Sequence, residues 1–157
     1  MQIVEPVRVE RTYTQKLHGK PDFIFPLLCP VRETEWAAGW NPLAVFTQSG
    51  FAETDCVFMT GEENPESIWV MTSFDTDRHR LEIVKVTPGM TVGRISIALK
   101  ESESGGTDAE VVYKYTAISP DGEEFVRGYS EDFFRRFMQF SESALNDYLD
   151  GLQGNGK

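Results

Sequence analysis

Cysteine and histidine are scarce in this sequence of 157 residues. The two cysteines, Cys29 and Cys56, stand far apart in the chain, and so do the two histidines, His18 and His79. A small disulfide-stabilised secreted domain would use more cysteines, so we expect both thiols to be reduced. A structural zinc site needs about four closely spaced ligands, which are not present, so we expect no metal and no cofactor.

Long apolar runs are missing as well. No stretch approaches the ~20 apolar residues that a membrane-spanning helix requires. The first six residues do not show a basic flank followed by an apolar stretch, which is the pattern of a signal peptide. Together with the reduced cysteines, these features predict a cytoplasmic protein that does not insert into membranes.

Positive charge is in short supply. The chain has 15 lysines and arginines against 25 aspartates and glutamates, a net charge of −10. Nucleic acids and anionic membranes are bound through cationic patches that displace counterions. We therefore expect no nucleic-acid partner.

The remaining composition is that of an ordinary globular protein, with 40% apolar and 25% charged residues. A chain of this length buries roughly 70% of its unfolded surface in a single core. We expect one domain over residues 1–152, followed by a disordered tail at 153–157.

Alternating and β-branched residues predict many short strands. The first covers residues 7–17, and two short helices follow it, at 23–28 and 31–38. Six further strands are expected at 43–48, 55–60, 68–75, 80–87, 91–101 and 107–118. Turn residues separate them, including a loop at 61–66 and Pro88-Gly89, which suits a type II turn. The short connections require neighbouring strands to be antiparallel.

A long helix closes the chain. After a turn at residues 119–122, apolar residues recur at steps of three and four from 126 to 152 and form a wide stripe. Gly128 marks a kink or a later start with Ser130 as the N-cap. Gly151 and Gly154 are expected to end the helix.

This element order predicts an α+β fold in which a curved seven-strand antiparallel sheet wraps the C-terminal helix, with two short helices after the first strand. The order resembles the helix-grip fold of the START-like, or SRPBCC, superfamily, which includes birch-pollen-allergen relatives and polyketide cyclases. The segment at 29–40, CPVRETEWAAGW, is similar to the second-helix region of uncharacterised bacterial members. Thr87-Pro88-Gly89 and residues 107–122 match as well. The resemblance implies a cavity for a hydrophobic small molecule.

Trp36 and Trp40 are spaced to share one face of the second short helix. They are either an aromatic lid at the mouth of the cavity or anchors that hold the helix to the sheet. Arg32 and Glu33 precede them, and these two residues either orient a polar ligand group or form a surface ion pair.

Strand parity around Lys114 turns Tyr113 and Tyr115 inward. Their hydroxyls point either at a polar ligand group or at backbone and water. In the strand at 68–75 the parity is ambiguous, because both faces are apolar, and Trp69 and Met71 are taken as ligand-lining residues.

The final helix is expected to turn Phe133, Phe137 and Met138 toward the sheet. Such a stripe is typical of a core, and in a helix-grip fold it can also line the cavity. The predicted pocket therefore lies between the sheet and this helix, with Trp36 and Trp40 near its mouth.

Three functions compete. The first hypothesis is a protein that binds an apolar or aromatic small molecule, lipid-like or polyketide-like. The second is an enzyme of the polyketide cyclase or dehydratase kind, with Tyr113, Tyr115 or Glu33 as acid–base groups. The third is a protein-interaction module with a filled cavity. No motif of nucleophilic catalysis or phosphate binding is present.

Overall fold

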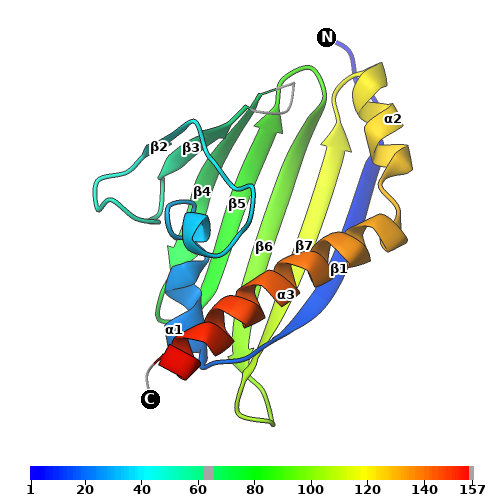
Figure 1. Ribbon diagram of the computed structural model, residues 1–157. Coiled ribbons are helices and arrows are strands. Elements are labelled where there is room, and N and C mark those ends of the chain that lie inside the picture. The colour runs from blue at the N-terminus through cyan, green and yellow to red at the C-terminus, as the bar shows by residue number, and fades with distance from the viewer. Residues whose placement is uncertain (62–65, 156–157) are drawn as a thin grey trace.

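The computed structural model describes residues 1–61 and 66–155 and has the predicted architecture (Figure 1). Seven antiparallel strands form one sheet in the order β1-β7-β6-β5-β4-β3-β2. Their bounds are Arg8–Leu17 (β1), Ala44–Phe46 (β2), Val57–Thr60 (β3), Ser67–Asp75 (β4), Arg80–Thr87 (β5), Thr91–Glu101 (β6) and Thr107–Ala117 (β7). The first strand pairs with the last, so the short helical segment after β1 carries the chain across to the opposite edge of the sheet.

The strand predictions are accurate where the turns are sharp. Both β5 and β6 have the predicted bounds, and Gly89 between them has φ +73°, as a type II turn requires. Strands β2 and β3 are shorter than predicted, and Asp55, at φ 73°, belongs to the turn before β3. Most of the predicted loop at 61–66 lies outside the described residues.

The helical segment after β1 is more broken than the sequence predicted. A single turn, α1 (Pro21–Ile24), continues into the 3₁₀ turn η1 (Phe25–Leu27), and a second 3₁₀ turn, η2 (Arg32–Glu35), follows. Pro26 explains the first change, because its ring and missing N–H disfavour a longer α-helix. The second helix, predicted at 31–38, is also shorter than expected and spans only the four residues of η2.

The C-terminal helix is divided in two, α2 (Pro120–Gly128) and α3 (Glu131–Asn155). The hydroxyl of Ser119 accepts a hydrogen bond of 3.0 Å from the N–H of Gly122, so the predicted turn at 119–122 is instead the start of α2. Ser130 caps α3, as predicted, by accepting a bond of 3.0 Å from the N–H of Phe133. The predicted end at Gly151 and Gly154 is wrong, because α3 continues to Asn155.

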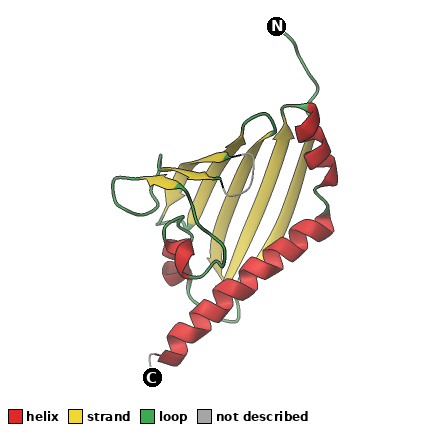
Figure 2. Ribbon diagram, turned by 45° about the horizontal axis from the view of Figure 1, so that its top comes forward, coloured by secondary structure: helices red, strands yellow, loops and turns green. Residues whose placement is uncertain are grey.

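Helix α3 crosses one side of the curved sheet and packs mainly against β1, while α2 covers the end of β7 (Figures 1 and 2). On the edge of α3 beside β1, Glu142 accepts a bond of 2.5 Å from the N–H of Lys16, and Asn146 bonds the backbone of Lys16 and His18. None of the helices within the described ranges is long and apolar enough to cross a membrane.

Buried apolar side chains gather in two clusters. The first joins α1, η1 and the C-terminal half of α3 to the sheet, and its members include Ile24, Phe25, Met71, Leu81 and Leu145. The second lies under α2 and the start of α3, and its buried members are Val111, Tyr115, Val126, Tyr129, Phe134 and Met138. Ile97 packs against both clusters. We call the face of the sheet that α3 crosses, and that carries both clusters, the concave face (Figure 1).

Candidate ligand-binding site

One row of side chains crosses four strands of the concave face. Strand pairing sets Trp69 opposite Lys85, Lys85 opposite Gly93, and Gly93 opposite Tyr115. Adjacent strands hold paired residues on the same face, so all four belong to the side of the sheet that carries the core. The next row, Met71, Ile83, Ile95 and Tyr113, has the same orientation. The register therefore resolves the ambiguity of β4 and turns Trp69 and Met71 inward.

Three aromatic rings surround one end of the first row. Trp69 stacks on Phe58 with ring centroids 5.2 Å apart and meets the edge of Trp40 at 6.1 Å. The ammonium group of Lys85 lies 4.4 Å from the centroid of a Trp69 ring, a cation–π contact. The indole N–H of Trp69 donates to the hydroxyl of Thr60 at 3.0 Å. We call Trp40, Phe58 and Trp69 the aromatic corner.

Trp36 and Trp40 both hold the helical segment in place through their indole N–H groups. Trp36 donates its indole N–H to the carbonyl of Leu27 at 3.0 Å, and Trp40 donates to the carbonyl of Pro30 at 2.7 Å. The two residues do not share a helix face, because η2 ends at Glu35. These bonds support the anchor interpretation for both, and Trp40 additionally reaches the aromatic corner.

Aromatic side chains also cover the two inward tyrosines. Tyr113 contacts the rings of Phe134 and Phe137 at 5.3 and 6.1 Å, and Tyr115 contacts those of Phe125 and Tyr129 at 5.3 and 5.2 Å. The inward orientation predicted from Lys114 is therefore confirmed for both tyrosines.

The face that α3 turns to the sheet differs from the prediction. Phe134 and Met138 are buried, at 2% and 3% exposure, whereas Phe133 and Phe137 remain 52% and 44% exposed. The prediction was right for Met138 and wrong for Phe133, and it missed Phe134. Phe137 lies on a flank of the helix, beside Tyr113 and away from the edge that bonds to β1.

Glu33 on η2 is the most unusual polar group near this face. Arg32 pairs with Glu35 rather than with Glu33, through bonds of 3.2 Å from both Nε and Nη2, so the ion pair that was one alternative for Arg32 and Glu33 does not form. Among the described residues, no group donates a hydrogen bond to the Glu33 carboxyl or forms an ion pair with it. Burial raises the pKa of this carboxyl to about 8.

The tyrosine hydroxyls share that environment. Burial raises the pKa of Tyr113 well above its ordinary value, and the charges of Tyr115, Tyr129 and Glu33 raise it further. Burial likewise raises the pKa of Tyr115. Neither Tyr113 nor Tyr115 has a hydroxyl hydrogen bond to any residue that the structure describes. Glu33 is therefore close enough to Tyr113 for its charge to act on the tyrosine hydroxyl.

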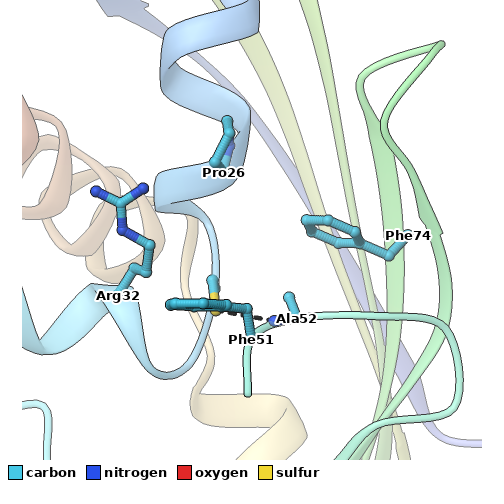
Figure 3. A pocket seen from close by; sticks show the side chains of 6 residues that line it. Pro26, Arg32, Phe51, Ala52 and Phe74 are labelled. Atoms are coloured by element: carbon cyan, nitrogen blue, oxygen red, sulfur yellow. Dashed lines mark hydrogen bonds between the residues drawn. The ribbon is translucent and has the colours of Figure 1, made fainter. Parts of the chain in front are cut away.

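Two hollows adjoin these elements. The first, which we call the side pocket, has a volume of about 250 Å³ and is lined by Pro26, Cys29, Arg32, Phe51, Ala52 and Phe74 (Figure 3). The second is a more open hollow of about 640 Å³ between α2, the start of α3 and the β5–β6 turn, and it includes Tyr129 and Phe133. Of the predicted ligand-lining residues, only Phe133 lines either hollow.

No three histidine, cysteine, aspartate or glutamate side chains of the described chain gather as metal ligands.

The sequence matches no family model and no curated protein, whereas many solved structures are similar to it. A point mutant of norcoclaurine synthase from Thalictrum flavum, in complex with a transition-state analogue, covers 96% of this chain and 99% of its own, with 10% identity and a TM-score of 0.70. The protein SA2116 from Staphylococcus aureus covers 94% and 98%, with 12% identity and a TM-score of 0.68. Ara h 8.0201 covers 92% and 99%, with 8% identity and a TM-score of 0.66. The chain has the helix-grip fold, in which a curved antiparallel sheet is crossed by a long C-terminal helix. Identities this low establish the fold alone.

Within this helix-grip chain, sequence reasoning missed two residues of the concave face. Lys85 was not considered, because a lysine inside an alternating strand is normally solvent-facing. Its spacing from Leu81 and Ile83 would have placed it inward. Phe58 was the other omission, and no periodic signal in the four-residue strand β3 points to it.

Proposed function

We propose that this protein binds an apolar or aromatic small molecule between the concave face of the sheet and α3, with the polar end of the molecule near Glu33 and Tyr113. The observation that carries the proposal is the pair of unpartnered polar groups on Glu33 and Tyr113, both of which are desolvated, with the ring of Phe134 against Tyr113. Buried polar groups normally have hydrogen-bond partners, and a missing partner calls for a bound water or ligand.

The accessibility of these groups supports a space beside them. Glu33 and Tyr113 both retain partial solvent contact, and no side-chain oxygen or nitrogen of the described residues is at once fully buried and unpartnered. A group that is desolvated by surrounding protein and still touches water-sized space fits the lining of an internal cavity.

The packing of the core supports the same location. Trp69 and Phe58 belong to neither of the two core clusters, and Ile95 at the centre of the sheet lies outside both. Helix α3 packs mainly along β1, at the far edge of the sheet from β4 (Figure 1). The proposed ligand would therefore lie over β4 to β7, lined by Trp69, Tyr113 and Phe137, with Trp36, Trp40 and Phe133 nearer its mouth. Met71, Tyr115 and Met138 would pack beneath it as members of the core clusters.

The comparison with norcoclaurine synthase favours a small aromatic ligand. A structure of that enzyme is described in complex with dopamine and hydroxybenzaldehyde, at 9% identity and a TM-score of 0.63 to this chain. The aromatic corner offers ring faces and edges to such a molecule.

Titration with 2-naphthol, followed by tryptophan fluorescence, tests the proposal. We expect saturable quenching, a loss of about 1 kcal/mol of binding free energy in Tyr113→Phe, and no loss in the control Tyr148→Phe, whose hydroxyl bonds Glu35 at 2.8 Å. Native mass spectrometry of freshly purified protein would identify a co-purifying molecule. Absence of binding by 2-naphthol and of any co-purified molecule would contradict the proposal and favour a protein-interaction module with a filled core.

One observation favours a second candidate, an acid–base enzyme of the polyketide cyclase or dehydratase kind. A carboxyl with a pKa of about 8 is close to the value that suits a general acid or base at neutral pH. In such a reaction Glu33 would take a proton from the carbon next to a carbonyl group, while the hydroxyl of Tyr113 donates a hydrogen bond to the developing enolate oxygen. Turnover that is lost in Glu33→Gln while probe binding remains would support this candidate over simple binding.

A further inference from the structure

We propose that the side pocket is a second, separate binding site, which takes a single-ring aromatic molecule carrying a carboxylate or carbonyl oxygen. The pocket lies between η1, η2, the loop before β3 and the end of β4 (Figure 3). It shares no residue with the site proposed on the concave face. The two proposals therefore stand or fall independently.

The size and walls of the pocket select the ligand. An apolar cavity of about 150 Å³ is enough to bind benzene, and the side pocket measures about 250 Å³. Its walls are the rings of Phe51, Phe74 and Pro26 and the methyl group of Ala52 (Figure 3). Phe74 is held in place by stacking on Phe25, with ring centroids 4.6 Å apart. A substituted benzene ring matches both the volume and the lining.

The backbone of Phe51 is held in place before any ligand binds, although the residue is 54% exposed. The hydroxyl of Thr47 donates to the carbonyl of Phe51 at 2.6 Å, and the N–H of Phe51 donates to the hydroxyl of Ser49 at 3.2 Å. Glu53 ties the same loop together by accepting hydrogen bonds from the backbone N–H groups of Gln48 and Ser49. An exposed aromatic ring on a well-bonded loop lowers the ordering cost of binding.

A hydrogen bond between Ala52 and Cys29 also holds the loop in position. The N–H of Ala52 donates to the thiol sulfur of Cys29 at 3.0 Å, so the loop is attached to the turn that follows η1 (Figure 3). Cys29 is 1% exposed, and its sulfur forms part of the lining. Both partners of this bond line the pocket.

Arg32 supplies the polar contact. Its Nε and Nη2 groups bond Glu35, which also accepts a hydrogen bond from Tyr148, and these bonds hold the guanidinium in position. Tyr148 also interacts with the guanidinium, and the Nη1 group is the donor that does not bond Glu35. A guanidinium N–H only donates, so the matching ligand atom is an acceptor oxygen.

Nuclear magnetic resonance titration with benzoate tests the site, with benzylamine as a probe of similar size and opposite charge. In 150 mM salt, we expect benzoate to shift the backbone N–H signals of Phe51 and Ala52 and to bind at least threefold more tightly than benzylamine. Benzoate should also slow the alkylation of Cys29 by iodoacetamide at least threefold. The alkylation of Cys56, which is buried but does not line the pocket, should not change.

Variants separate the side pocket from the rest of the surface. Ala52→Leu fills the pocket and should abolish the benzoate shifts. Phe51→Ala removes a half-exposed wall without opening the core and should weaken benzoate at least threefold. Phe46→Ala is the matched control, because Phe46 is 60% exposed and lies outside the pocket. Shifts that survive both pocket variants, equal or tighter binding of benzylamine, or no saturable shift with benzoate would each overturn the proposal.

Discussion

The ring of Tyr115 lies over Gly93 on the neighbouring strand. A Cβ atom at position 93 would come within 2.8 Å of Cε1 of this ring. The missing side chain therefore lets Tyr115 lie flat across β6, toward the row that continues through Lys85 to Trp69. Glycine inside a strand is otherwise unfavourable, and here its presence is explained by this close approach.

Gly93→Ala should push the ring of Tyr115 out of position. Overpacking of this kind costs roughly 1–3 kcal/mol, which urea unfolding can measure. Gly128→Ala is the control, because no atom beyond its chain neighbours and its own helix backbone lies within 4 Å of the Cβ that it would add. Equal stability of the two variants would show that the Tyr115 ring is free to move aside.

Glu33→Gln should change how stability depends on pH. The folded pKa of about 8 lies above the ordinary value of 4.5, so the folded protein holds this proton more tightly than the unfolded chain. The contribution of the Glu33 carboxyl to the free energy of unfolding is therefore fully present below about pH 4.5. It is lost as the pH rises to about 8, and the loss is on the order of a few kcal/mol. Urea unfolding at pH 5, 7 and 9 should show this loss in the natural protein and not in Glu33→Gln.

The variant Glu35→Gln is the control, because the pKa of Glu35 is shifted in the opposite direction to that of Glu33. Hydrogen bonds from Arg32 and Tyr148 lower the pKa of Glu35, so its contribution is present above the ordinary pKa and is lost as the pH falls. A Glu33→Gln profile parallel to that of the natural protein would mean that Glu33 is solvated.

Phe134→Ala and Phe133→Ala test which face of α3 meets the sheet. Phe134 is buried against Tyr113 and Tyr129, and its truncation should cost roughly 3–5 kcal/mol. Phe133 is half-exposed, so the same truncation should cost less than about 1 kcal/mol. Thermal unfolding followed by circular dichroism distinguishes the two, and the reverse order of stability would place the helix in a different rotation.

The two cysteines should be free but slow to react. Both are unpaired and buried, and burial raises the pKa of the Cys56 thiol. Alkylation without reductant should modify both residues in denaturant and neither at a comparable rate in the native protein. Intact-mass measurement checks this, and a species that resists labelling in denaturant would reveal oxidation.

The sequence determined the strands and the fold class because their signals are local. Alternation around Lys114 was enough to turn Tyr113 and Tyr115 inward, and Pro88-Gly89 fixed the turn between two strands of correctly predicted length. Ser130 could be identified as a cap for the same reason. A turn or a cap depends on residues within a few positions of it, so its chemistry can be read along the chain.

Only the tertiary structure decided the rotation of α3 and the surroundings of single polar groups. Periodicity predicts which residues share a helix face, but Phe133, Phe134 and Phe137 span more than one face, and packing against the sheet selected Phe134. The same holds for Glu33, which burial desolvates, and for Glu35, which accepts a hydrogen bond from Tyr148 on the distant helix α3. Burial and pairing arise from contacts across the chain, and no local pattern encodes them.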